Sequence, residues 1–362
     1  MIWRNKLKIP ELKFGNIIAK IPIVQGGMGV RVSLAPLAAA VANEGGIGTI
    51  SSIGLGDIED SKRDYAKMSR DALIDEIRAA KKMTDGHLAV NIMGVLSNAD
   101  DLIKTAVREG IKIIVFGAGV PSKLPEVVED KSVNIVPIIS SARVASIILR
   151  TWVKRYNQIP EAFILEGPLA GGHLGFNEEQ LKDIDNYSVE KILPEILETI
   201  KPFEDKFGRK IPVIAGGGIF TGEDIIKMLS IGAAGVQLGT RFVCTNECTV
   251  SPKFKQAYID SKKEDIEIIK SPVGMPGRAI KNEFLKTVER EGKLKIKCPY
   301  KCLTVCNSDE AHYCIAKALV NSYVGDMDNG LIFCGANAYR IEKVVSVKEL
   351  ISELLSPFKS NA

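Results

Sequence analysis

The sequence predicts an α/β protein, a (β/α)8 TIM barrel with a small inserted, mainly helical subdomain. Two observations lead to this fold: eight short apolar runs rich in Val and Ile alternate with segments of helical periodicity, and the most glycine-rich turn follows the seventh run. A doubly wound open sheet usually has fewer strands and carries its glycine-rich turn after the first one, so the barrel is favoured. With 362 residues, the chain is long enough for a barrel and an appendage.

Each predicted strand is an almost unbroken apolar run, as is typical of parallel strands buried on both faces. The runs are IPIV (21–24), GIGTI (46–50), LAVNIM (88–93), KIIVF (112–116), NIVPII (134–139), AFILEG (162–167), IPVIAGGG (211–218) and AGVQLG (234–239). Helical spacing separates them, most clearly in residues 71–83. We therefore assign residues 1–250 to the barrel.

The alternation fails beyond residue 250. Residues 251–265 have a helical pattern, residues 271–282 (SPVGMPGRAIKN) predict a loop, and a Cys-rich stretch begins at residue 298. We predict that residues 251–310 form a lid-like subdomain at the C-terminal, active-site face of the barrel. Residues 311–362 are expected to contain helices, over about 309–323 and 347–355, that pack back on the barrel.

Composition excludes several classes of protein. Lys and Arg number 48 against 44 Asp and Glu, a net charge of +4 that is spread along the chain, so we expect no nucleic-acid partner. No apolar stretch approaches the roughly 18 residues that span a bilayer, and the N-terminus lacks an apolar signal core. Seven cysteines, none before Cys244, do not make the disulfide framework of a secreted protein. We therefore expect a cytoplasmic location and no membrane partner.

Two glycine-rich turns at the ends of the seventh and eighth strands predict a phosphate site. Gly217 and Gly218 end one strand, and Gly239 and Thr240 end the next, just before a short predicted helix. In a barrel these turns offer backbone N–H groups to a phosphate. The alternative is a pair of tight turns without a ligand, because glycine suits any turn with positive φ.

Two further motifs place polar groups at strand ends. LEGPLAGGHLGF carries Glu166, Gly172 and His173 past the sixth strand, where the imidazole is either a site residue or a structural turn residue. QGGMG follows the first strand, and its Gly26, Gly27 and Met28 either line a ligand or form a turn with a core methionine. Asn91, within the third strand, is either a core amide or a group that recognises a planar ring.

Taken together, these motifs resemble the nitronate monooxygenase (2-nitropropane dioxygenase) family, which also includes FMN-dependent enoyl-acyl-carrier-protein reductases. The resemblance rests on PIVQGGMG, LEGPLAGGHLG, PVIAGGGI and GVQLGTRF, and it runs from about residue 20 to 285. It implies a barrel that binds FMN without a covalent link. Leu169 departs from the acidic residue of the commoner EAGGH form, which bears on the substrate rather than on the cofactor.

The resemblance also implies roles for the residues singled out above. Gly26, Gly27 and Met28 would line the flavin, Asn91 would contact its ring system, and His173 would be the active-site imidazole. Gly217, Gly218, Gly239 and Thr240 would hold the phosphate, and Glu166 and Gly172 are further candidate cofactor contacts.

The function predicted on this basis is oxidation of alkyl nitronates with FMN and dioxygen, with His173 moving or orienting a carbon-bound proton. The alternative is an FMN-dependent NAD(P)H enoyl-thioester reductase on the same scaffold. A nucleotide-monophosphate dehydrogenase or isomerase would need a catalytic Cys where this chain has His173. A non-catalytic thiol or metal sensor is a further alternative. We expect a small-molecule substrate, and a homodimer is compatible with the sequence.

A Cys-rich stretch reads Cys298-x3-Cys302-x3-Cys306-x7-Cys314. If it were helical from Pro299, the first three thiols would share one face and could ligate zinc or an iron–sulfur cluster. Core cysteines and redox-active thiols are the alternatives. The spacing is not specific, so we assign no metal ligand from it.

Overall fold

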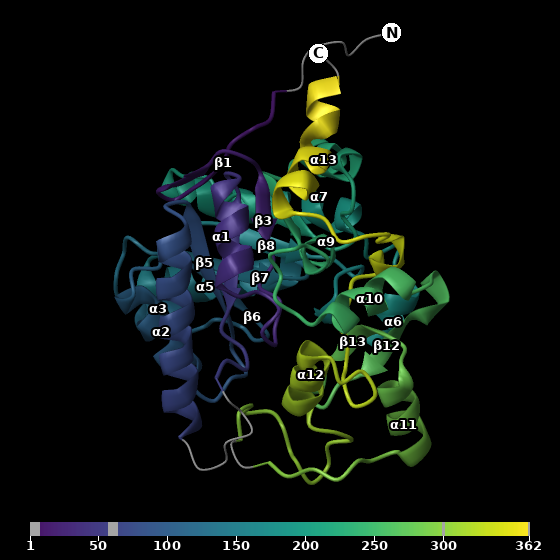
Figure 1. Ribbon diagram of the computed structural model, residues 1–362. Helices are drawn as coiled ribbons and strands as arrows, with labels where there is room; N and C mark the ends of the chain where they lie inside the picture. The colour runs from purple at the N-terminus through teal and green to yellow at the C-terminus, as the bar shows by residue number, and fades with distance from the viewer. Residues whose placement is uncertain (1–7, 57–63, 299–300, 361–362) are drawn as a thin grey trace.

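The computed structural model describes residues 8–56, 64–298 and 301–360 (Figure 1). Eight parallel strands form a closed barrel in the order β3-β4-β5-β6-β7-β8-β10-β11, and β11 pairs with β3 to close it. This confirms the eight predicted strands in their predicted order. They are β3 (Ile23–Gln25), β4 (Ile47–Ser51), β5 (His87–Met93), β6 (Ile113–Gly117), β7 (Asn134–Ile139), β8 (Phe163–Glu166), β10 (Val213–Gly216) and β11 (Gly235–Leu238).

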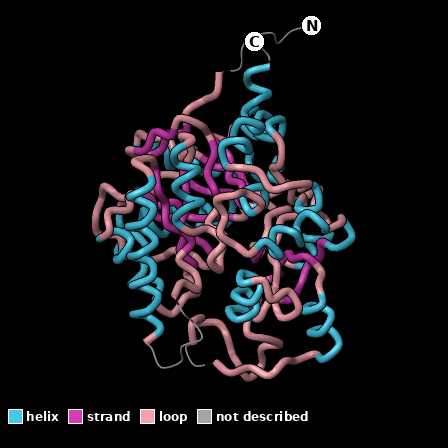
Figure 2. Tube along the Cα trace, in the orientation of Figure 1, coloured by secondary structure: helices cyan, strands magenta, loops and turns pink. Residues whose placement is uncertain are grey.

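Helices lie around these strands, as the cyan helices around the magenta strands show in Figure 2. In α2 (Tyr65–Met83), Leu73, Ile77 and Ala80 are buried at spacings of four and three residues, which turns one face toward the barrel. None of the described helices is long and apolar enough to cross a membrane. The other helices that follow barrel strands are α1 (Ala35–Asn43), α3 (Ala99–Arg108), α4 (Leu124–Val127), α5 (Ala142–Tyr156), α6 (Glu178–Lys182), α7 (Val189–Phe207), α8 (Gly222–Ser230) and α9 (Thr240–Val243).

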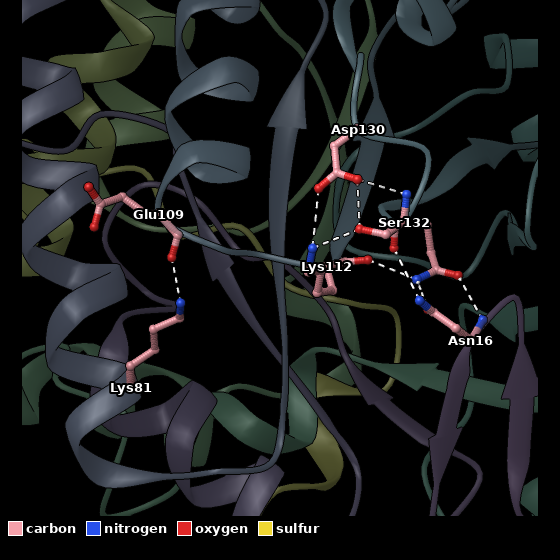
Figure 3. Close-up of polar contacts among 7 residues, drawn as sticks. Asn16, Lys81, Glu109, Lys112, Asp130 and Ser132 are labelled. Carbon is pink, nitrogen blue, oxygen red and sulfur yellow. Dashed lines mark hydrogen bonds and ion pairs between the residues drawn. The ribbon is translucent and has the colours of Figure 1, made fainter.

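An N-terminal hairpin seals one end of the barrel. Strands β1 (Leu12–Phe14) and β2 (Ile17–Ala19) pair antiparallel, and their buried side chains pack with those inside the barrel. In the hairpin turn, Asn16 Nδ2 donates to the Ser132 carbonyl at 3.2 Å, and Lys112 Nζ donates to Ser132 Oγ at 2.7 Å (Figure 3). Because this contact lies at the N-terminal ends of the strands, the opposite end is left for a ligand.

A second, three-stranded sheet lies at that opposite end. Strand β12 (Ile266–Lys270) pairs with β13 (Pro276–Ile280), and β13 pairs with β9 (Gly172–His173). The prediction that residues 271–282 form a loop is therefore wrong for β13. Its Pro and Gly residues hide the strand pattern, yet Pro276 is the first strand residue, where a proline is tolerated.

The segment after residue 250 contains more helix than strand, and it also includes β12 and β13. Its helices are α10 (Pro252–Asp260), the 3-10 turn η1 (Lys263–Asp265) and α11 (Glu283–Glu291). With β12, β13 and α12 (Ile315–Val324), they gather at the lower right of Figure 1, away from α1.

The C-terminal region agrees with the prediction in part. Helix α13 (Val347–Ser360) packs against α8 and α1, as expected, and a short 3-10 turn, η2 (Ala338–Arg340), precedes it. Helix α12 begins six residues later than predicted, at Ile315. Residues 301–312 are not helical, so the condition under which the first three cysteines would share a helical face is not met there; residues 299–300 lie outside the described residues. The reason is that Thr304 N donates to Val95 O at 2.9 Å, in the loop after β5, rather than to its own segment.

Candidate active site

A cavity of about 840 Å³ opens at the C-terminal ends of the barrel strands. Most of its wall consists of aliphatic side chains and glycines, with a few polar groups between them. Every site residue singled out in the sequence lines this one cavity: Gly26, Gly27, Met28, Asn91, Glu166, Gly172, His173, Gly217, Gly218, Gly239 and Thr240. Residues from strand ends far apart in the chain therefore meet in a single site, as the closed barrel requires.

Buried side chains hold the QGGMG turn in one conformation. Gln25 is fully buried, and its Nε2 donates to Gly26 O at 2.5 Å and to Ser33 Oγ at 2.6 Å. Its Oε1 accepts from Thr49 N at 2.9 Å, and Ser33 Oγ accepts from Met28 N at 2.9 Å. Because these groups are satisfied within the protein, the turn presents its glycines and Met28 to the cavity as a rigid surface.

Gly27 and Asn91 are in close contact at the ends of β3 and β5. A Cβ atom added at Gly27 would lie 2.2 Å from the Cβ atom of Asn91, so a larger residue requires a backbone shift. Asn91 Nδ2 donates to Gly27 O at 3.3 Å, which orients the amide. The pair adds a polar amide and a backbone carbonyl to the cavity wall.

The two glycine turns after β10 and β11 lie beside a segment that sequence analysis did not single out. Gly217 and Gly218 have φ angles of +94° and +84°, which favour glycine. Asn337 Nδ2 donates to Gly218 O at 2.7 Å, and Gly335 N donates to Thr240 Oγ1 at 3.0 Å. The chain between α12 and α13 therefore braces both turns and lines the cavity with them.

His173 is held by the β12–β13 turn and by an aromatic ring. Its Nε2 lies 2.7 Å from Ser271 Oγ, and its ring meets Phe333 edge to face with centroids 5.0 Å apart. Burial lowers the pKa of His173 to about 4, so the imidazole is neutral at pH 7. A neutral ring offers one N–H donor and one lone pair in an apolar cavity.

Arg278 fixes the loop that carries His173. Arg278 lies on β13, is 4% exposed, and donates from Nη1 to Pro168 O at 2.7 Å and Ala170 O at 2.6 Å. Burial lowers its pKa. Two carbonyls of the β8–β9 loop are satisfied by one guanidinium, so the loop and β13 move together.

Glu166 ends β8 and lines the cavity. Burial raises the pKa of its carboxyl to about 7. Near neutral pH the group is therefore divided between a charged acceptor and a neutral donor, a property typical of functional sites.

These residues fit a flavin. The apolar wall suits a ring system, the amide of Asn91 can hydrogen-bond the ring edge, and the positive-φ glycines let the chain approach a phosphate without a Cβ atom in between. Within the described residues, no group of three or more His, Cys, Asp or Glu side chains could hold a single metal ion.

Comparison with known proteins agrees with this arrangement. The model of the nitronate monooxygenase family matches residues 11–356. The chain belongs to the nitronate monooxygenase family. The members that resemble it include flavin-dependent oxidoreductases, and the predicted barrel and family are both confirmed.

Three of the proteins that resemble this chain have different names and levels of sequence identity. The chain is 30% identical over 268 residues to (3aS,4S,5R,7aS)-5-hydroxy-7a-methyl-1-oxo-octahydro-1H-indene-4-carboxyl-CoA dehydrogenase of Mycobacterium tuberculosis, a match that covers 74% of this chain and 65% of that protein. It is 25% identical over 316 residues to a probable nitronate monooxygenase of Staphylococcus saprophyticus, covering 77% and 81%. The structure of FabK from Thermotoga maritima has a TM-score of 0.74 and 26% identity, and 94% of each chain is covered.

No sequence motif identified above includes the residues that support the site from outside the barrel as site residues. Ser271, Arg278, Phe333 and Asn337 all lie after residue 250, in segments without barrel periodicity. Within SPVGMPGRAIKN, part of the family resemblance, Arg278 was visible as a charged residue amid apolar and small ones. No local sequence pattern distinguishes Phe333 or Asn337 as a site residue.

Proposed function

We propose that the protein is an FMN-dependent oxidoreductase that reduces the α,β-double bond of an acyl thioester. The observation that carries the proposal is the cavity of about 840 Å³ with its largely aliphatic wall. That volume is toward the upper end of the roughly 300–1,000 Å³ typical of ligand sites. It leaves space beside a flavin ring for an acyl chain, which a compact nitronate anion does not need.

The rim of the cavity supports the same substrate class. Lys297 and Lys317 are exposed and line the cavity. An exposed residue in the wall lies where the cavity meets solvent, so we place these two lysines at its opening. A thioester of coenzyme A or of a carrier protein carries phosphate groups outside the pocket that receives the acyl chain. Lysines at the opening provide the matching charge.

When bound, FMN would supply the hydride that is transferred to the β-carbon. The glycine turns ending in Gly218 and Gly239 would hold its phosphate, and Asn91 would orient its ring. His173 would relay a proton from solvent to the α-carbon: one ring nitrogen gives up its proton, Nε2 takes one from Ser271 Oγ, 2.7 Å away, and solvent reprotonates the serine hydroxyl. The imidazole stays neutral throughout, in keeping with its low pKa.

Anaerobic reduction of the flavin tests the proposal. We expect NADPH or NADH to bleach the flavin absorbance and crotonyl-CoA to restore it. A flavin that neither nicotinamide reduces, or that crotonyl-CoA does not reoxidise, contradicts the reductase assignment.

The lysines provide a second test. The double variant Lys297→Ala/Lys317→Ala should raise the KM for crotonyl-CoA by roughly 5-fold, because exposed charge pairs contribute little each. The KM for crotonyl-N-acetylcysteamine, which lacks phosphates, should not change. Lys295→Ala is the matched control, because Lys295 is exposed but does not line the cavity.

Oxidation of alkyl nitronates with FMN and dioxygen is the second candidate. It is favoured by the matching family model and by the similarity to a probable nitronate monooxygenase. The same anaerobic measurement of flavin absorbance distinguishes the two reactions. Rapid reduction of the flavin by propyl-2-nitronate, with slow reduction by NADPH, would establish the nitronate reaction instead.

A further inference from the structure

The active-site cavity extends beyond the residues that the proposed reaction uses. His173 and Asn91 lie on β9 and β5, but part of the cavity wall comes from the loop after β5 and from described residues between 297 and 322. This part contains four aliphatic side chains, none of them on a barrel strand or in a glycine turn. We call them the outer wall: Leu96, Leu303, Ile315 and Leu319.

Backbone pairing joins two members of the outer wall into one surface. Leu96 and Leu303 form an antiparallel bridge, although about 200 positions separate them. Beside the bridge, Thr304 donates to the Val95 carbonyl from its backbone N at 2.9 Å and from Oγ1 at 3.1 Å. The two leucines are 4% and 8% exposed. Because the backbone holds them in register, they form a fixed part of the wall.

Helix α12 supplies the other two members from one of its faces. Ile315, Leu319 and Ser322 line the cavity at spacings of four and three residues, which places them on the same side of the helix. Ser322 Oγ donates to Leu319 O at 2.9 Å, so its hydroxyl is satisfied within the helix. Val324, on the same helix, does not line the cavity and is 61% exposed. Helix α12 therefore turns an apolar face toward the cavity.

The neighbours of the outer wall place no carboxylate beside it. Cys302 and Cys314 line the same cavity, and burial raises the pKa of Cys302 to about 12, so this thiol is neutral and packs as a small apolar group. Among the described residues that line the cavity, Glu166 is the only carboxylate, and it ends β8. Lys297 and Lys317 are exposed to solvent. An apolar ligand could therefore contact the outer wall without burying a charge.

We propose that the outer wall holds the far end of the acyl chain, and that the preferred acyl group is longer than crotonyl. Burial of apolar surface favours such a chain, and the four side chains offer no hydrogen bond to a polar one. Leu319 lies between Ile315 and Ser322 on the cavity face of α12, so the size of its side chain limits the chain length. The inference rests on the thioester substrate proposed above.

Binding of saturated acyl-CoA thioesters to the flavin-loaded protein tests this inference without turnover. By titration calorimetry, we expect octanoyl-CoA to bind at least about 10-fold more tightly than butyryl-CoA, because each buried methylene contributes up to about 4-fold in Kd. Leu319→Trp should remove most of this preference and leave butyryl-CoA unaffected, because the indole fills only the space of the distal carbons. Val324→Trp, exposed on the same helix, is the matched control and should keep the wild-type preference.

Leu319→Ala changes the same position in the opposite direction. The smaller side chain should raise the affinity for dodecanoyl-CoA relative to octanoyl-CoA above the wild-type ratio. The flavin absorbance of each variant shows whether it folds. Three results would overturn the inference: equal affinities of the wild type for butyryl-CoA and octanoyl-CoA, an equal loss of both in Leu319→Trp, or wild-type preferences in both Leu319 variants.

The outcome is separable from that of the proposed reaction. If octanoyl-CoA binds with the expected preference but crotonyl-CoA does not reoxidise the reduced flavin, the reductase assignment fails and the outer wall remains an acyl site. If crotonyl-CoA reoxidises the flavin but chain length does not affect binding, the role of the outer wall fails and the reductase assignment stands.

Discussion

The Nε2 atom of His173 lies 2.7 Å from the hydroxyl oxygen of Ser271, although 98 positions separate the two residues. The contact exists because β9, which contains His173, pairs with β13, and the tight turn before β13 contains Ser271. The appended segment therefore places a hydroxyl group against the imidazole at the mouth of the barrel. A lid that only covered the cavity would leave the imidazole without this partner.

We expect His173→Asn to keep its flavin and to lose turnover by about 10²- to 10⁴-fold, the usual value of a positioned acid or base. The flavin spectrum checks cofactor content, and steady-state kinetics with the thioester checks the loss. Wild-type turnover in this variant would make His173 a structural residue of the β9 turn.

Ser271→Ala should lower kcat with little change in KM, because the imidazole loses its proton source but the cavity keeps its shape. We expect a smaller loss than for His173→Asn, since water can enter in place of the hydroxyl. Ser271→Thr restores a hydroxyl and should recover much of the rate. Equal kcat values for the Ala and Thr variants would show that the hydroxyl transfers no proton.

Gly27→Ala and Gly26→Ala form a matched pair. At Gly27 the new methyl group would lie 2.2 Å from Asn91, whereas at Gly26 its nearest neighbour in the protein is 3.5 Å away. The flavin-free Gly27→Ala protein should therefore melt at a lower temperature than the wild type, and flavin-free Gly26→Ala should not. If both bind flavin as tightly as the wild type, the QGGMG turn does not line the cofactor.

Gly217→Val should leave largely flavin-free protein, because its Cβ atom would lie 3.0–3.1 Å from backbone atoms of Gly167 and Ala170 and would displace the turn. The control is Gly292→Val. Gly292 also has a positive φ, +70°, but nothing lies within 4 Å of an added Cβ, so it reports backbone strain alone. Bound flavin, measured by absorbance after purification, should fall in the first variant only. Full flavin content in Gly217→Val would exclude this turn from the site.

Glu166 predicts a defined pH dependence of stability in the flavin-free protein. Its pKa is about 7 in the folded protein against an ordinary 4.5, so the folded state retains a proton that the unfolded state loses. The free energy of unfolding contributed by this group therefore falls as pH rises from about 4.5 to 7. Glu166→Gln cannot ionise, so its melting temperature relative to the wild type should rise across that window. A constant difference between the two proteins would show that the carboxyl does not titrate there.

Local signals in the sequence were sufficient for the barrel and for one half of its site. Parallel strands buried on both faces must be apolar at nearly every position, as in β4 and β6, and such runs are visible without knowing their partners. Glycines at strand ends are equally visible, because turns such as Gly217–Gly218 need positive φ wherever the chain goes next. The sequence by itself therefore determined the strand order and the positions that would meet at the C-terminal face.

Tertiary structure alone decided which residues support that face. The sequence of β13 predicts a loop because it contains Pro and Gly and shows no strand periodicity. The strand forms because it pairs with β12 and β9, and this pairing cannot be detected in the sequence of β13 itself. The bond between Ser271 and His173, and the contact of Asn337 with Gly218, join residues about 100 positions apart. Periodicity indicates how each short segment is buried. These contacts depend instead on which distant segments are brought together, and only the folded tertiary structure determines that.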